Sequence, residues 1–170
     1  MLAEMESMLF SLGLEEDQEE KLMHLADQAK LKLEKSAGSR IVNVASYWAG
    51  DMDLGDPEFK TRHYNNDTAY RQSKQADRML TVAFAERLKS KKITVNVCHP
   101  GDVRSTLASN LGYGGHETPE QGAAMPVWLG TSPEVEEITE KYFEHLQEAT
   151  CRFGQDDLMV EKLYRLCEKY

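Results

Sequence analysis

Long apolar runs are absent from this sequence: no stretch reaches about 18 consecutive apolar residues, the length at which a membrane-spanning helix is predicted. The first 20 residues are acidic rather than basic, which does not fit the charge pattern of a secretory signal peptide. We therefore expect a protein without a membrane span, located in the cytoplasm.

Cysteine is also scarce. The three cysteines, Cys98, Cys151 and Cys167, are far apart and form no Cys-x-x-Cys pair, which argues against zinc and disulfide-exchange motifs and favours a reducing compartment. The five histidines show no metal-ligand spacing. His99, which precedes Pro100 at the predicted end of a strand, is interpreted as structural, and we expect no metal site.

An excess of basic residues is missing as well. The chain has 29 acidic and 20 basic side chains, a net charge of −9, which argues against nucleic acid or an anionic membrane as the main partner. A length of 170 residues and a hydrophobic content of 41% are sufficient for the core of one domain.

A tyrosine and a lysine are spaced for proton transfer. Tyr70 and Lys74 are four residues apart in a predicted helix and would share one face. A phenol is a poor acid or base at neutral pH, but a nearby cation favours its phenolate form. The pair could therefore exchange protons with a bound alcohol or carbonyl, although the same spacing is common on solvated helix surfaces.

Two predicted strands flank this helix. Residues 40–46 and 93–98 are short, apolar and β-branched, and they end at Ser46 and at Pro100-Gly101. A strand, a helix and a second strand form a right-handed βαβ unit, whose ligand site lies at the carboxyl ends of the strands. Both ends would therefore meet Tyr70, unless Ser46 merely terminates a strand and Pro100-Gly101 is an ordinary turn.

Taken together, residues 41–46, 70–74 and 99–105 resemble the catalytic half of a short-chain dehydrogenase/reductase, and they are most similar to its retinol-dehydrogenase-like branch. Residues 118–124 and 141–143 continue the likeness, which covers about residues 38–170. The resemblance implies a partial Rossmann-like α/β fold, with about three parallel strands and flanking helices.

The same resemblance implies roles for individual residues. Tyr70 would be the general acid/base, Lys74 would hold the cofactor's ribose hydroxyls, and Ser46 would bind the substrate oxygen. The residues matching the loop on the nicotinamide side of the cofactor are Pro100, Gly101, Val103 and Ser105. The implied cofactor is NAD or NADP, and the implied substrate is a hydrophobic alcohol or carbonyl compound.

The first 37 residues depart from this family. Residues 1–40 contain only Gly13 and Gly38, so no glycine-rich pyrophosphate loop can be formed there. No asparagine precedes Asn43, so the helix asparagine that supports the family's proton relay is missing. Residues 1–37 instead predict two amphipathic helices, which would form an N-terminal segment before a catalytic half at 38–170.

Further elements complete the predicted domain. We expect a loop over the site at residues 50–67, a long helix at 69–88 and a flexible substrate loop at 110–115. Thr118 and Pro119 should begin a helix, and residues 140–144 and 156–169 should form the last strand and the closing helix. The sheet edge where the missing nucleotide-binding half would sit should lack a partner strand, which favours association with another copy or another protein.

Three functions are compatible with these features. The first is a truncated NAD(P)-dependent oxidoreductase that lacks its nucleotide-binding half and has little or no dehydrogenase activity as an isolated chain. The second is a catalytically inactive remnant that acts as a protein-interaction module through the open sheet edge. The third is a domain that binds a small alcohol or carbonyl without turnover.

Overall fold

A computed structural model describes residues 28, 31–32, 35, 38–110 and 112–169. The principal elements are β1 (Arg40–Val44), α3 (Asn66–Leu88), β2 (Thr94–Cys98), α4 (Thr106–Asn110), α5 (Pro119–Thr131), β3 (Tyr142–Glu144), β4 (Gln147–Ala149) and α6 (Asp157–Cys167). Short 3-10 turns occur at η1 (Lys89–Lys91), η2 (Pro133–Val135) and η3 (Arg152–Gly154).

One sheet organises the fold, in the strand order β1-β2-β3-β4. β1 pairs with β2 in parallel, with Ile41 opposite Val95, and β2 pairs with β3 in parallel. These three strands confirm the predicted α/β fold with parallel strands. β4 was not predicted: it pairs antiparallel to β3 through a tight turn and adds a fourth strand.

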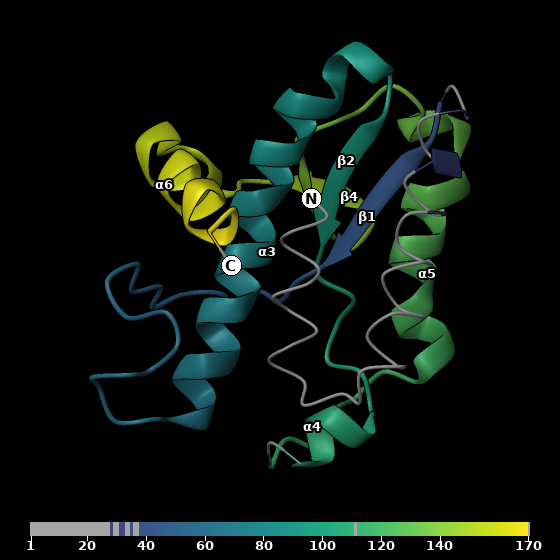
Figure 1. Ribbon diagram of the computed structural model, residues 1–170. Coiled ribbons are helices and arrows are strands. Elements are labelled where there is room, and N and C mark those ends of the chain that lie inside the picture. Colours follow the sequence, from purple (N-terminus) through teal and green to yellow (C-terminus); the bar gives the residue numbers. More distant parts are fainter. Residues whose placement is uncertain (1–27, 29–30, 33–34, 36–37, 111, 170) are drawn as a thin grey trace.

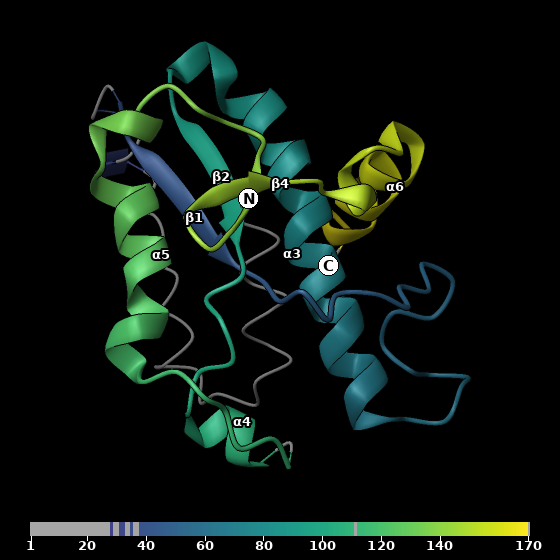
Figure 2. The same cartoon turned by 180° about the vertical axis from the view of Figure 1, so that it is seen from behind.

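Helices cover both faces of the sheet (Figures 1 and 2). On one face, Ile41 and Val95 pack with Ala85 and Leu88 of α3, and α6 packs on the outer side of that helix. The other face packs against α5 through a cluster that includes Cys98, Met125, Leu129 and Phe143. This alternation follows from the two-residue period of a strand, which sends neighbouring side chains to opposite faces.

Local sequence signals explain where the main helices begin. Asn65 caps α3 by accepting a hydrogen bond from the backbone N–H of Thr68 at 2.9 Å, so the predicted helix is confirmed but starts three residues early, at Asn66. The predicted start of α5 is also confirmed. Thr118 and Gln121 form a reciprocal capping box there, with Pro119 in the first turn.

Contrary to our prediction, the polar segment 50–67 before α3 does not lie over the site. It is fastened to α3, because the Asp51 carboxylate accepts from Arg71 Nε at 2.6 Å and Met52 N donates to Gln75 Oε1 at 3.1 Å. It then extends beyond the N-terminal half of α3, away from the sheet (Figure 1). Within the described chain, no residue of 50–67 lines the cavity described below.

The predicted amphipathic stripes of residues 1–37 lie outside the described residues, so the predicted domain boundary at residue 38 stays a prediction. In the part of the chain that the structure describes, no helix combines the length and the apolar character that crossing a bilayer requires.

Candidate active site

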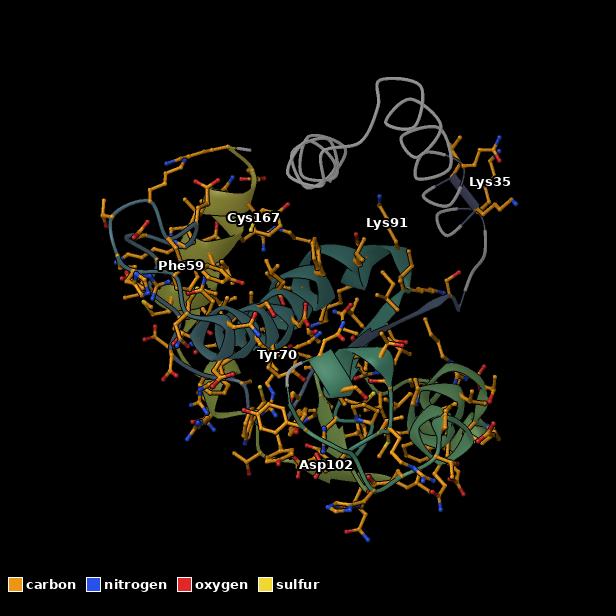
Figure 3. All side chains as sticks on the ribbon, turned by 90° about the horizontal axis from the view of Figure 1, so that it is seen from below. Lys35, Phe59, Tyr70, Lys91, Asp102 and Cys167 are labelled. Atoms are coloured by element: carbon orange, nitrogen blue, oxygen red, sulfur yellow. The ribbon has the colours of Figure 1, made fainter. Side chains whose placement is uncertain are left out.

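Three segments meet at the carboxyl ends of the parallel strands. Ser46 follows β1, residues 99–105 follow β2, and Tyr70 and Lys74 lie in the first turns of α3. Because parallel strands end at the same edge of a sheet, this topology brings the three segments together. Viewed from that edge, Tyr70 lies near the centre of the molecule and Asp102 lies below it, whereas Phe59 of the preceding loop lies at the periphery (Figure 3).

A cavity of about 460 Å³ opens between these segments. Its lining includes all seven residues selected from the sequence: Ser46, Tyr70, Lys74, Pro100, Gly101, Val103 and Ser105. The structure therefore brings the proposed proton-transfer residues and the proposed cofactor loop around one space, although the two groups come from separate parts of the chain.

Ser46 is held rigidly at the end of β1. It is 5% exposed, and its Oγ accepts a hydrogen bond from the Trp48 backbone N–H at 3.1 Å. Its carbonyl oxygen accepts from Ala49 N at 3.2 Å and from Arg78 at 2.7 Å. Since the hydroxyl oxygen is used as an acceptor, its own hydrogen remains available for donation to a ligand in the cavity.

Lys74 is tethered by two contacts. Its ammonium lies 2.9 Å from the carbonyl oxygen of Val44 and 2.9 Å from the carboxylate of Asp77. An ammonium has three N–H donors, so one is left for a ligand. The hydroxyl of the half-buried Tyr70 has no hydrogen-bond partner among the described residues, and its side chain borders the same cavity.

The loop after β2 is fixed by backbone contacts. Gly101 has φ +97°, a left-handed conformation that favours glycine, and a Cβ there would lie 3.1 Å from the Glu117 side chain. The carbonyl of Asp102 accepts from His116 N at 2.6 Å and from Glu117 N at 3.0 Å. Ser105 caps α4, since its Oγ accepts from Ala108 N at 3.1 Å. This wall of the cavity is therefore preorganised.

Aromatic rings form the other wall. The rings of Trp48 and Tyr113 meet edge to face with centroids 4.6 Å apart, and those of Tyr47 and His99 do so at 4.7 Å. Tyr113 belongs to the segment 110–115 that we had interpreted as a substrate loop, and its residues 112–115 line the cavity. Tyr47 and Trp48 were not selected as site residues. Their positions directly after Ser46 were the available signal.

Two ionisable side chains at the end of β2, those of His99 and Cys98, are uncharged near pH 7. Burial lowers the pKa of His99, against the opposing effect of the Glu144 and Asp102 carboxylates, so the ring is neutral near pH 7. Burial raises the pKa of the Cys98 thiol to about 12. Among the described residues, no three His, Cys, Asp or Glu side chains converge as metal ligands.

The parallel sheet, its covering helices and a cavity at the carboxyl edge define a Rossmann-like α/β protein. The short chain dehydrogenase family model matches residues 21–113, more than half of the chain and all seven site residues. The chain belongs to the short-chain dehydrogenase family, and membership supports the prediction of NAD or NADP as cofactor.

Human relatives are similar to most of this chain. Retinol dehydrogenase 13 of Homo sapiens is 32% identical over 151 residues, which cover 78% of this chain and 46% of that protein. Retinol dehydrogenase 14 of Homo sapiens is 33% identical over 152 residues, covering 80% of this chain and 45% of that protein. The chain thus spans about half the length of the curated relatives that it matches, and within the family it is retinol-dehydrogenase-like.

A solved structure supports the fold. An uncharacterized protein from Mycobacterium paratuberculosis superimposes with a TM-score of 0.60 at 23% identity, covering 77% of this chain and 49% of that one.

Proposed function

We propose that this chain is the catalytic half of an NAD(P)-dependent oxidoreductase that interconverts an alcohol and a carbonyl. The observation that supports it most strongly is the convergence of Ser46, Tyr70 and Lys74 with residues 100–105 on one cavity. The aromatic wall formed by Tyr47, Trp48 and Tyr113 favours a hydrophobic substrate, in keeping with the retinol dehydrogenases that the chain resembles.

Each residue has a separate task in this proposal. Ser46 donates its hydroxyl hydrogen to the substrate oxygen and stabilises the negative charge that develops there. Tyr70 delivers a proton to that oxygen during reduction and removes it during oxidation. Lys74, one turn further along the same helix, also lines the cavity and holds the cofactor beside Tyr70.

The residues present fit one end of such a cofactor. The remaining N–H donor of Lys74 suits ribose hydroxyls, and the loop at Pro100–Gly101 lines the cavity where the nicotinamide would bind. The cofactor would supply the hydride, and the chain would supply orientation and the proton. Because residues 1–40 contain no glycine-rich phosphate loop, we propose that the isolated chain has little or no turnover.

The direct test is a titration of the purified chain with NADH and with NADPH, followed by quenching of Trp48, which lines the cavity. Saturable binding that Lys74→Ala weakens is the expected result. A folded chain that binds neither nucleotide would contradict the cofactor part of the proposal.

A second candidate function is a protein-interaction module, and the open side of β1 favours it. Among the described residues, β1 pairs only with β2. The carbonyl oxygen of Ser39 and the backbone N–H of Ala45 form hydrogen bonds with β2. In a parallel ladder every second residue directs its backbone groups toward the same neighbouring strand. The backbone groups of Arg40 and Val42 therefore point away from β2. Such an edge can accept a strand from a second copy or from another protein.

A further inference from the structure

Arg78 is a buried cation beneath the cavity. Its residue is 4% exposed, although it belongs to the middle of α3, where arginine normally reaches solvent. The guanidinium carbon lies 3.6 Å from the centre of the Tyr142 ring, and one nitrogen lies 3.9 Å from the Glu144 carboxylate. Burying this charge is costly, so its contacts must offset that cost.

One of those contacts leads directly to the site. The guanidinium donates to the carbonyl oxygen of Ser46 at 2.7 Å, the same oxygen that accepts from Ala49 N. The turn 46–49 is closed by its own Ala49–Ser46 hydrogen bond, and its Ser46 end is held by Arg78 of α3. This turn carries the Ser46 hydroxyl and the rings of Tyr47 and Trp48, which all line the cavity.

The partners of Arg78 are themselves fixed. Tyr142 is 2% exposed in β3, and its hydroxyl donates to the carboxylate of Glu144. The flat guanidinium thus bridges β3 and the end of β1, a task that requires both its face and its N–H groups. A lysine could donate to Ser46 but could not stack as a planar group on Tyr142.

We infer that Arg78 is a positioning residue, which holds the Ser46–Ala49 turn so that the Ser46 hydroxyl and the Trp48 ring face the cavity. The catalytic consequence rests on the proposed oxidoreductase function, whereas the structural consequence does not. A displaced serine would donate poorly to the substrate oxygen, and a misplacement of about 1 Å can cost about 100-fold in rate.

The experiment uses the full chain with Trp128→Phe, so that Trp48 is the remaining tryptophan. Acrylamide quenching of Trp48 is compared for Arg78→Met, Arg78→Lys and the control Arg87→Met. Arg87 is a matched residue on α3, because it stacks on Tyr164 at 3.4 Å and pairs with Glu161 at 2.7 Å, and none of these three residues lines the cavity. Far-UV circular dichroism and thermal unfolding establish that each variant is folded.

We expect Arg78→Met to increase Trp48 quenching and Arg78→Lys to increase it less, while Arg87→Met leaves it at the parent level. Where the parent chain reduces an apolar ketone at a measurable rate, Arg78→Met should lower kcat about 100-fold with little change in KM. Arg78→Lys should recover part of that loss.

Equal Trp48 quenching in folded Arg78→Met and Arg87→Met chains would overturn the inference. If Arg78→Met does not fold, Arg78→Lys decides, since quenching at the parent level would show that the planar guanidinium is not needed. A parent chain that binds neither NADH nor NADPH would count against the proposed function, but the quenching comparison would still decide the role of Arg78.

Discussion

The Lys74 ammonium is paired with the carboxylate of Asp77, 2.9 Å away and one turn further along α3. This carboxylate occupies one of the three Lys74 N–H donors, and it therefore competes for the ammonium with the ribose hydroxyls that the proposed function assigns to the remaining donor. The two side chains are 24% and 37% exposed, so solvent screens the pair and its strength is below about 1 kcal/mol.

Asp77→Asn should therefore tighten NADH binding by up to about fivefold, as expected for the loss of a competing partner of that strength. The measurement is the Trp48 titration described above. Asp51→Asn is the control, because the Asp51 carboxylate pairs with Arg71 at 2.6 Å on the same helix but lies outside the cavity lining. Unchanged or weaker nucleotide binding by Asp77→Asn would contradict the competition.

Tyr70→Phe should lower the catalytic rate without changing the stability of the fold. Its hydroxyl has no hydrogen-bond partner among the described residues, so its removal should leave the thermal unfolding midpoint unchanged. Any ketone reduction by the chain should fall by about 100-fold or more, because general acid catalysis contributes at least that factor. Tyr64→Phe, at a tyrosine that is 59% exposed, serves as control. Full activity in Tyr70→Phe would exclude the phenol as the proton donor.

The cysteines should differ sharply in reactivity. Cys98 is fully buried in β2, and burial raises the pKa of its thiol to about 12, so its thiolate is scarce at pH 8. We expect Ellman's reagent to leave Cys98 unmodified in the folded chain and to react with it after unfolding. Peptide mapping identifies the modified residue, with Cys98→Ala as the control. Rapid modification of Cys98 in the native chain would show that β2 opens readily.

The loop before α3 should lose stability in acid. Burial of the Asp56 carboxylate raises its pKa, but hydrogen bonds from the backbone N–H groups of residues 60–62 and the Thr61 hydroxyl outweigh burial and lower it. The folded chain therefore binds this proton less tightly than the unfolded chain. The stabilisation is present above the ordinary pKa of about 3.9 and is lost as the pH falls further.

Asp56→Asn should accordingly lower the unfolding midpoint at pH 7, and the difference from the parent should shrink below about pH 4. Thermal unfolding followed by circular dichroism across this pH range measures both chains. Asp53→Asn is a suitable comparison, since that carboxylate accepts from Gly55 N at 2.8 Å in the same loop. A difference that stays constant in acid would mean that the charge of Asp56 is not the stabilising feature.

The open side of β1 predicts association that depends on one backbone donor. Val42→Pro removes an N–H that points away from β2, and it preserves the extended backbone that proline tolerates at a sheet edge. If a second copy pairs with β1, size-exclusion chromatography with light scattering should show a larger species for the parent and for Val42→Thr, but a monomer for Val42→Pro. A folded Val42→Pro chain that still associates would place the contact elsewhere.

Sequence patterns were sufficient for the elements with strong local signals. The β-branched runs at 40–44 and 94–98 became parallel strands, and Thr118 with Pro119 marked the start of α5. Asn65 was an equally clear cap for α3, but the prediction was centred on Tyr70 and placed the start of the helix too late. β4 has little strand propensity in Gln147–Ala149 and depends on its pairing with β3, a tertiary contact that local patterns do not encode.

The sequence predicted several residues that line the cavity, but not the side-chain contacts around them. Ser46 and Pro100–Gly101 were predicted from their positions at strand ends, and Tyr70 with Lys74 from their spacing on a helix. The pairing of Lys74 with Asp77, in contrast, depends on side-chain conformations. Arg78 shows the limit most clearly. A charged residue in the middle of a helix predicts solvent exposure, and only the approach of Tyr142 and Ser46 from two different strands explains its burial.

The parallel pairing of β1 with β2 also bears on how the chain folds. A short turn cannot join two parallel strands, so the ladder between them can close only when the segment that contains α3 crosses back over the sheet. Tyr70 and Lys74 belong to that helix. Pairing of the two central strands therefore also brings both residues back to the side of the sheet on which β1 ends, so sheet formation and site assembly are linked by the connectivity of the chain.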